Sequence, residues 1–233
     1  MLLDYEAREN AILNLLKKLR EADVEFVLVG GYAVSALASH RFSVDCDLVV
    51  PNSSLKKIRS ILKAEGYKKQ QEKKGFDKVY GGSFESYVKK IADLDVTVDL
   101  LVESLASRDS GASWSYREIK SKSNLKTVAG VSMAVANLVP SKEQMIAFKI
   151  HAGRLADVRD IVMMSDGVDW NSIAELLKRG KLKVVKRKIR DIVEILTDKN
   201  TIDSLKGVYS RKGDVSKMID MTIKHLKILV DKV

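Results

Sequence analysis

Residues 24–50 read VEFVLVGGYAVSALASHRFSVDCDLVV, and this stretch carries most of the information about the fold. Residues 24–29 are an apolar run rich in valine, which is typical of a short buried strand, and Gly30-Gly31 ends it. A short helix is expected from Tyr32 to about Ser39, and a second strand from Ser43 to Val50. A strand, helix and strand in this order, followed by further helices, indicate an α+β domain.

The second strand carries two aspartates. Asp45 and Asp47 are two residues apart, and side chains at that spacing on a strand share a face. The other face is then expected to be buried, and its residues are Val44, Cys46 and Leu48. Two neighbouring carboxylates repel each other unless a cation lies between them, and Mg²⁺ prefers carboxylate oxygens. The Asp-x-Asp pattern alone is weak evidence, because exposed strands often alternate acids.

A third acid lies on a later strand, expected from Leu94 to Val102. One face of this strand carries Asp95, Thr97 and Asp99, and the other face is apolar. If the strand lies beside the first acid pair, Asp99 completes a group of three carboxylates. Asp95 is the alternative third acid.

The rest of the chain separates into two parts. Helices are expected at 5–22 and at about 53–65, and a strand-rich region runs from 67 to 137. Beyond Pro140 the pattern is helical throughout, with helices expected at 141–165, 171–179, 181–198, 201–207 and 214–232. The sequence therefore predicts a mixed-sheet α+β domain at 1–138 and an all-helical domain at 139–233.

Composition points to a soluble protein of the cytoplasm. The chain has 233 residues, 45% of them hydrophobic, and no apolar run long enough to span a membrane. Its N-terminus lacks the basic and then apolar order of a signal peptide. Cys46 is the single cysteine, which excludes an internal disulfide and agrees with a reducing compartment.

The net charge of +10 is concentrated in one segment. Lys178 to Arg190 contains eight basic residues and no acid. Such a run could attract a polyanion such as RNA, with Lys183, Lys186, Arg187 and Arg190 on one exposed helix stripe. The alternative is an ordinary solvated helix face in a lysine-rich protein.

Several of these residues together resemble a known family. Gly30-Gly31, then Asp45-x-Asp47 and a later Asp99 resemble the DNA polymerase β-type nucleotidyltransferase superfamily. Residues 41–48, RFSVDCDL, are similar to the Arg-x-Thr/Ser-x-Asp-x-Asp run of its antibiotic-modifying and abortive-infection toxin branches. The resemblance covers about residues 24–165.

A downstream helix adds to the resemblance. Lys149, Arg154, Asp157 and Asp160 resemble the Lys…Arg-x-Lys-Asp-x2-Asp helix of the same branches, although Ala156 stands where a lysine is usual. The chain beyond about residue 170 matches no pattern of that superfamily.

The resemblance implies a nucleotidyltransferase that moves a nucleoside monophosphate from an NTP to a hydroxyl acceptor. Asp45, Asp47 and Asp99 would be catalytic and would hold two divalent ions, Mg²⁺ or Mn²⁺. The residues that would bind the nucleotide are Gly30, Gly31, Arg41, Ser43 and Lys149. Whether the acceptor is a small molecule, a tRNA or a protein stays open.

Each of these assignments has a plainer alternative. Gly30-Gly31 could be an ordinary strand-to-helix turn, and Lys149 could be an exposed helix lysine. Arg154 and Asp157 could form a surface ion pair, and Asp157 and Asp160 could support the junction between domains instead of catalysing. At the level of function, the alternative is a non-catalytic module that binds a nucleotide or RNA on the same fold.

Overall fold

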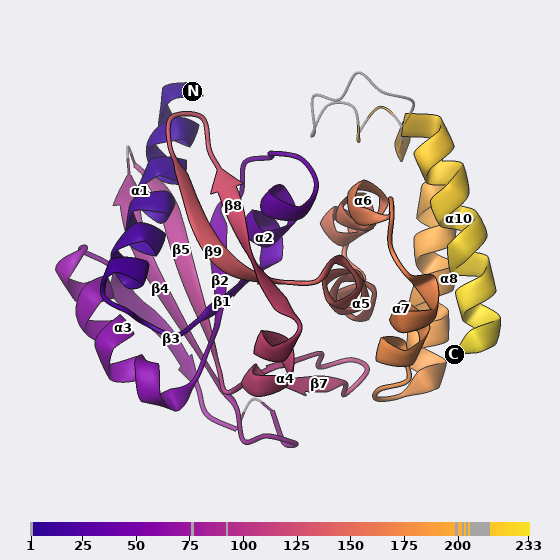
Figure 1. Cartoon of the computed structure of the whole chain (residues 1–233), viewed down its shortest axis with the longest axis horizontal. Helices are drawn as coiled ribbons and strands as arrows, with labels where there is room; N and C mark the ends of the chain where they lie inside the picture. The colour runs from indigo at the N-terminus through magenta and orange to yellow at the C-terminus, as the bar shows by residue number, and fades with distance from the viewer. Residues whose placement is uncertain are drawn as a thin grey trace. The chain divides into compact units, whose positions relative to one another are not determined.

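The computed structural model describes residues 2–75, 77–91, 93–198, 200, 201, 203, 205 and 215–233. Its contacts divide the chain into two compact units: Met1–Ala106 with Ser113–Pro140, and Ser107–Ala112 with Ser141–Val233 (Figure 1). The first unit contains a mixed sheet and the second is helical, which confirms the α+β fold class. The domain limits 1–138 and 139–233 stay a prediction, since this division falls after Pro140 and assigns residues 107–112 to the second unit.

The first unit is built on a five-stranded sheet in the order β1-β2-β5-β4-β3. The strands are β1 (Val27–Val29), β2 (Asp45–Val50), β3 (Lys68–Lys73), β4 (Ser83–Ile91) and β5 (Leu94–Val102). Strands β2 and β5 are parallel, and the other neighbouring pairs are antiparallel. The sheet is therefore mixed, with its one parallel pair at the strands that carry the three aspartates.

Helices bury one face of this sheet. The helices of the sheet region are α1 (Leu2–Glu21), α2 (Gly30–Leu37) and α3 (Asn52–Ala64). Helix α1 packs on β4, β5 and α3. Its leucines on one helix face, Leu15, Leu16 and Leu19, are fully buried. The apolar side chains that alternate with the aspartates on β2 and β5 are buried as well, so the aspartates are left to the other face. These buried residues are Cys46, Leu48, Val96, Val98 and Leu100.

Two small ribbons complete the first unit. They are formed by β6 (Ser104–Ala106) with β7 (Ser113–Ser115), and by β8 (Ser123–Ala129) with β9 (Ala134–Pro140). A short helix, α4 (Tyr116–Ser121), interrupts the region that the sequence predicts as strands. Ser115 and Glu118 cap it reciprocally, so the signal for this helix is a capping box within a strand-like pattern.

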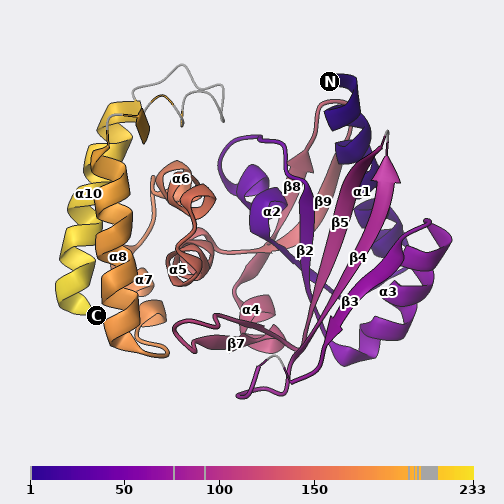
Figure 2. The ribbon, with the colours of Figure 1, turned by 180° about the vertical axis from the view of Figure 1, so that it is seen from behind.

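The second unit contains α5 (Lys142–Ala152), α6 (Leu155–Met164), α7 (Trp170–Leu177), α8 (Leu182–Thr197) and α10 (Val215–Lys232), which Figure 2 shows from behind. The single helix expected at 141–165 is wrong. It breaks at Gly153, which is left-handed with φ 68°, and Arg154 is extended. The helix expected at 201–207 lies mostly outside the described residues, where no structure is assigned. No described helix is long and apolar enough to cross a membrane.

Candidate active site

The three aspartates lie on one face of the sheet. Strand β2 pairs with β5 so that Asp47 is directly opposite Asp99, and Asp45 is opposite Thr97. Neighbouring strands are about 4.8 Å apart, which makes Asp47 and Asp99 nearest neighbours across the sheet. Asp45 lies on the same face of β2, two residues before Asp47. The fold thus brings together acids that are 54 positions apart along the chain.

Asp95, the alternative third acid, lies away from the row formed by Asp45, Asp47 and Asp99. It precedes the part of β5 that pairs with β2, and its register partner is Lys90 on β4. The Asp95 side chain is exposed, while its backbone carbonyl accepts a hydrogen bond from the Arg8 guanidinium. Asp99 is therefore the acid that the sheet places beside the pair on β2.

The apolar face of β2 agrees with the sequence except at one residue. Cys46 and Leu48 are fully buried, but Val44 is 43% exposed, so its predicted burial is wrong. Strand β2 begins only at Asp45, so Val44 precedes the part of the strand that the helices cover. Burial, with added repulsion from the neighbouring aspartates, raises the pKa of the Cys46 thiol. That thiol stays protonated and serves in packing.

Gly30 and Gly31 form the first turn of α2 and approach other parts of the chain closely. Gly30 has φ 68°, and a Cβ there would collide with the Asp47 carboxylate. A Cβ on Gly31 would lie 2.5 Å from Ser43 Oγ and 3.0 Å from a guanidinium nitrogen of Arg41. The glycines therefore let three polar side chains reach the N-terminus of a helix, where backbone N–H groups favour negative charge.

Hydrogen bonds fix the loop that carries Arg41 and Ser43. The Ser35 hydroxyl lies within hydrogen-bond distance of the backbone of both Gly31 and Arg41. Tyr32 donates its hydroxyl to the Ser43 carbonyl at 3.1 Å, and Ser43 Oγ donates to the Asp45 carbonyl at 3.2 Å. The order Arg41-x-Ser43-x-Asp45 is thus held against the start of α2 by contacts within the segment itself.

Asp99 has an unusual environment for a carboxylate. It is half-buried, and its Oδ1 is buried with no hydrogen-bond partner among the described residues. Burial raises the pKa of Asp99; the hydroxyl of Ser86 partly offsets this rise, and the charge of Asp45 adds to it. An anionic oxygen buried without a donor is costly, and a bound cation would remove that cost.

Two hydroxyl side chains lie beside the acids, and the sequence alone indicates a role for neither. Thr97 donates its hydroxyl to Asp45 Oδ1, and Ser86 on β4 lies directly opposite Asp99. The strand pattern places Thr97 on the face of Asp95 and Asp99, but its contact with Asp45 depends on how β5 pairs with β2. Nothing in the sequence marks Ser86, because its position depends on how β4 pairs with β5.

The donors fit a divalent cation, although a finished cage is not present. Among the residues that the structure describes, no group of three His, Cys, Asp or Glu side chains is arranged to hold a metal ion. The available ligands are carboxylate oxygens only, and Asp99 Oδ1 has no other partner in this part of the chain. Mg²⁺ commonly takes one or two protein carboxylates and completes its shell with water and substrate phosphate. The residues present therefore suit a divalent cation whose remaining ligands are water or phosphate oxygens.

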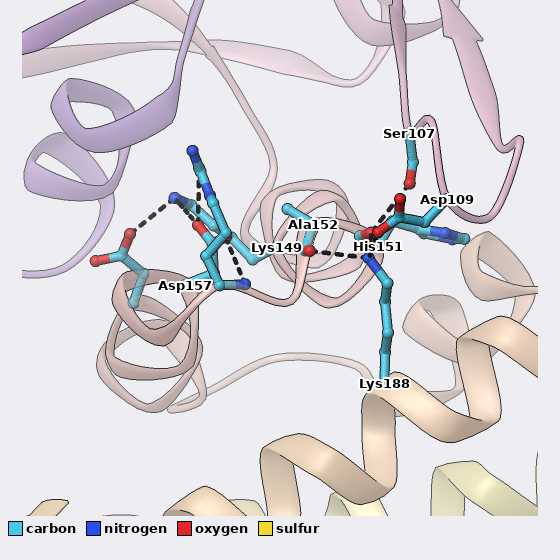
Figure 3. Close-up of polar contacts among 9 residues, drawn as sticks. Ser107, Asp109, Lys149, His151, Ala152, Asp157 and Lys188 are labelled. Carbon is cyan, nitrogen blue, oxygen red and sulfur yellow. Dashed lines mark hydrogen bonds and ion pairs between the residues drawn. The ribbon is translucent and has the colours of Figure 1, made fainter.

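In the second unit, Lys149 lies at the centre of a buried ion cluster (Figure 3). Its ammonium lies 2.7 Å from Asp157 Oδ1 and 2.8 Å from Asp160 Oδ2, and all three side chains are buried. Arg154 adds a contact of 2.8 Å from Nε to Asp157 Oδ2, with its own side chain 74% exposed. The plainer alternative of an exposed Lys149 is therefore wrong. The Arg154–Asp157 ion pair is present, but only its arginine lies at the surface.

The positive charges around Asp157 lower the pKa of its carboxyl. Burial alone would raise the pKa of Asp157, but the hydrogen bonds and charges of Arg154 and Lys149 lower it below its ordinary value. Lys149 and Arg154 together match the two aspartates in charge. The sequence pattern was informative here because Lys149, Asp157 and Asp160 project from two consecutive helices, α5 and α6, that pack on each other.

Lys188 differs from the other basic residues of the run between Lys178 and Arg190 because its side chain is buried. Its ammonium donates to the carbonyls of His151 and Ala152, at 2.7 and 2.9 Å, and contacts Asp109 at 2.9 Å (Figure 3). It therefore satisfies the C-terminus of α5, where carbonyl groups attract a cation. The four residues of the expected stripe differ from Lys188, since Lys183, Arg187 and Arg190 are exposed and Lys186 is half-buried.

A family model now identifies the class of protein. The model described as "Uncharacterised nucleotidyltransferase" matches residues 6–197, which include the acids, the glycines and the Lys149 helix. The chain belongs to this nucleotidyltransferase family. The family match confirms the nucleotidyltransferase resemblance that the sequence showed. No protein of curated function matches the chain.

Several solved structures resemble this chain at low sequence identity. JHP933 from Helicobacter pylori is 17% identical with a TM-score of 0.48, covering 99% of this chain and 92% of that one. The antibiotic-resistance factor ANT(2'')-Ia is 14% identical with a TM-score of 0.49, covering 72% and 88%. The lincosamide adenylyltransferase LnuA is 17% identical with a TM-score of 0.46, covering 69% and 98%. Likenesses this distant assign no substrate to this family member.

Proposed function

We propose that this family member transfers a nucleoside monophosphate from an NTP to a hydroxyl acceptor, using divalent cations held by Asp45, Asp47 and Asp99. The observation that supports this most directly is the parallel pairing that places Asp47 opposite Asp99, with Asp45 on the same face. The buried Asp99 Oδ1 without a donor supports cation binding at the same point. Mg²⁺ or Mn²⁺ would lower the pKa of the acceptor hydroxyl and neutralise charge on the phosphates.

The residues around the acids would position the nucleotide. Gly30 and Gly31 would present backbone N–H groups to the β- and γ-phosphates, with Ser43 and Arg41 beside them. Lys149 would add positive charge for the triphosphate, and Asp157 and Asp160 would fix the direction of its ammonium.

Asp99 would orient the acceptor hydroxyl and take its proton. The acceptor oxygen then forms a bond to the α-phosphorus while the bond from that phosphorus to the bridging oxygen breaks, and pyrophosphate leaves. In this type of transfer most of the rate enhancement comes from positioning and from charge neutralisation. The raised pKa of Asp99 suits proton acceptance better than the ordinary pKa of an exposed aspartate would.

The decisive experiment compares two acids on the same strand. Each α-labelled NTP is incubated with the protein, Mg²⁺ or Mn²⁺ and cell extract, and transfer of label to any acceptor is measured. Asp99→Asn should lower transfer by roughly 100-fold or more, because the acid beside Asp47 is lost. Asp95→Asn is the matched control, since Asp95 is an exposed acid of β5 outside the row, and it should leave transfer unchanged.

Other outcomes would overturn the proposal. Equal transfer by the parent and Asp99→Asn would remove Asp99 from the reaction. A parent protein that binds an NTP with Mg²⁺ but labels nothing with any of the four nucleotides would favour the non-catalytic binding module instead.

For the acceptor we propose RNA, bound through the basic stripe on α8. Lys183, Lys186, Arg187 and Arg190 supply four positive charges on one helix within eight residues. A small acceptor gives no reason for such a concentration of charge, whereas a phosphate backbone does. Lys188 is not part of this surface, because it is buried and bound to α5.

A further inference from the structure

Thr97 has the closest contact with the first aspartate of the pair. It lies directly opposite Asp45 in the β2–β5 register, and its hydroxyl donates to Asp45 Oδ1. Its backbone N–H also donates to the Val44 carbonyl at 3.4 Å, so Thr97 holds both the chain just before β2 and the first side chain of β2. No other described hydroxyl is recorded in contact with the Asp45 carboxylate.

Asp45 needs such a partner more than the other two acids do. Its side chain is exposed at the start of β2, whereas Asp47 and Asp99 are both half-buried. Ser43 holds only the backbone carbonyl of Asp45, at 3.2 Å, and does not orient its carboxylate. An exposed carboxylate without a fixed neighbour samples several rotamers, and a cation must then order it on binding.

We propose that Thr97 is a positioning residue of the cation site: its hydroxyl holds one oxygen of Asp45 so that the other oxygen faces the cation. This inference rests on the proposed function. A hydroxyl has a single hydrogen, so Thr97 engages one oxygen and leaves the second to the metal. Hydrogen-bond partners of metal-ligating carboxylates commonly change metal affinity by about 10- to 100-fold when they are removed.

Threonine suits this position for two reasons that can be separated by mutation. Its branched Cβ fits the pleated strand β5, and its hydroxyl reaches across to β2. Valine keeps the shape and the strand preference while it removes the donor. Serine keeps the donor and removes the methyl group. If the role of Thr97 is purely structural, the variant that keeps its shape should behave like the parent. If Thr97 positions Asp45, the variant that keeps its hydroxyl should do so.

The test measures Mn²⁺ binding by electron paramagnetic resonance on the full chain, without nucleotide and without turnover. We expect Thr97→Val to weaken Mn²⁺ binding about 10-fold with an unchanged melting temperature, and Thr97→Ser to bind like the parent. The matched control is Thr127→Val. Thr127 is an exposed threonine of β8 in the β8–β9 ribbon, and its replacement should not change Mn²⁺ binding.

Each remaining outcome would overturn either the positioning role of Thr97 or the cation site itself. If Thr97→Val binds Mn²⁺ as tightly as the parent, or if Thr97→Ser is as weak as Thr97→Val, the hydroxyl does not position Asp45. If the parent protein and Asp99→Asn bind Mn²⁺ equally weakly, then the cation site of the proposed function is absent, and the role of Thr97 falls with it. A lowered melting temperature in Thr97→Val with normal Mn²⁺ binding would make Thr97 a structural residue.

Discussion

At the scale of single residues, the candidate site depends on how closely side chains approach backbone. Gly31 is the clearest case, because Ser43 Oγ and the Arg41 guanidinium fill the space where its Cβ would be. The same approach puts two phosphate-binding candidates at the N-terminus of α2. Residue 31 is therefore constrained by its neighbours' side chains and not by its own backbone conformation, since Gly30 is left-handed and Gly31 is not.

This difference leads to a prediction for Gly31→Ala. The new methyl group should push Ser43 and Arg41 away from the helix N-terminus and weaken NTP binding about 10-fold or more, an amount equal to roughly 1.4 kcal/mol. The fold should tolerate the change, because alanine favours a helix by about 1 kcal/mol over glycine. Isothermal titration with an NTP and Mg²⁺ measures binding, and a thermal melt measures stability.

Gly75→Ala is the opposite control. Gly75 has φ 61° and open space around its Cβ position, so alanine there should lower the melting temperature and leave NTP affinity unchanged. If Gly31→Ala binds the nucleotide like the parent, the glycine pair is an ordinary strand-to-helix turn.

At the scale of elements, strand β4 contributes a hydroxyl side chain to the face of the aspartates and an ion-paired glutamate to the other face. Ser86 lies opposite Asp99, while the flanking Glu85 and Tyr87 point to the other face. There Glu85 is buried and receives hydrogen bonds from Arg59 of α3, Lys69 of β3 and Tyr87. One strand thus connects the candidate site with an ion cluster that ties α3 and the edge strand to the sheet.

The cluster predicts a dependence of stability on pH. Burial would raise the pKa of Glu85, but its bonds to Arg59, Tyr87 and Lys69 outweigh burial and lower it to about 2. Because the folded pKa lies below the ordinary value of 4.5, the stabilisation is complete above about pH 5 and disappears as the pH falls towards 2. Urea unfolding of the parent between pH 7 and 2.5 should show this loss.

Glu85→Gln should remove that part of the pH dependence. At pH 7 it should lower the free energy of unfolding by roughly 2 kcal/mol, a modest amount because the Arg59 side chain is 43% exposed. Glu72→Gln is the control, since Glu72 shares the partner Lys69 but is solvated, and it should change little. Equal pH profiles for the parent and Glu85→Gln would show that other carboxylates control acid unfolding.

At the scale of the whole molecule, the two units differ in how much excess positive charge they carry. The net charge of +10 is unevenly distributed, and the stripe of four basic residues on α8 is its densest part. The buried Lys188 is occupied by carbonyl groups and Asp109 within the second unit, so it adds little to the field outside. Attraction of a polyanion then depends on the exposed stripe.

Reversal of two charges in the stripe tests the RNA acceptor. If RNA binds there, its affinity should fall steeply between about 50 and 200 mM salt, because bound counterions are released. Lys186→Glu with Arg187→Glu should weaken RNA binding and reduce the slope of log affinity against log salt by roughly 1.4 to 1.8, as expected for two lost phosphate contacts. Filter binding or fluorescence anisotropy measures both quantities, and NTP affinity should not change.

Lys224→Glu with Lys227→Glu supplies the matched control. Both lysines are exposed on α10 of the same unit, so the net charge changes equally at a different surface. If the two double variants bind RNA equally, the effect is one of overall charge. If the parent binds no RNA at low salt, a small-molecule or protein acceptor replaces the RNA proposal.

The sequence by itself determined the local features of this protein. Asp45 and Asp47 share a face because a strand alternates its side chains, and Ser141 caps α5 because its hydroxyl accepts the free N–H of Gln144. The α+β class and the nucleotidyltransferase resemblance also follow from short motifs and from their order and spacing along the chain. All of these depend on periodicity or spacing along the chain, which one sequence displays in full.

The tertiary structure decided everything that depends on which strands are neighbours. The choice of Asp99 over Asp95, and the places of Thr97 and Ser86 beside the acids, follow from the registers of β5 with β2 and β4. The burial of Lys149 required α6 to fold back on α5 after Gly153. A strand shows which of its residues share a face, but the register across the sheet is set by long-range packing of that face, and no window of sequence contains it.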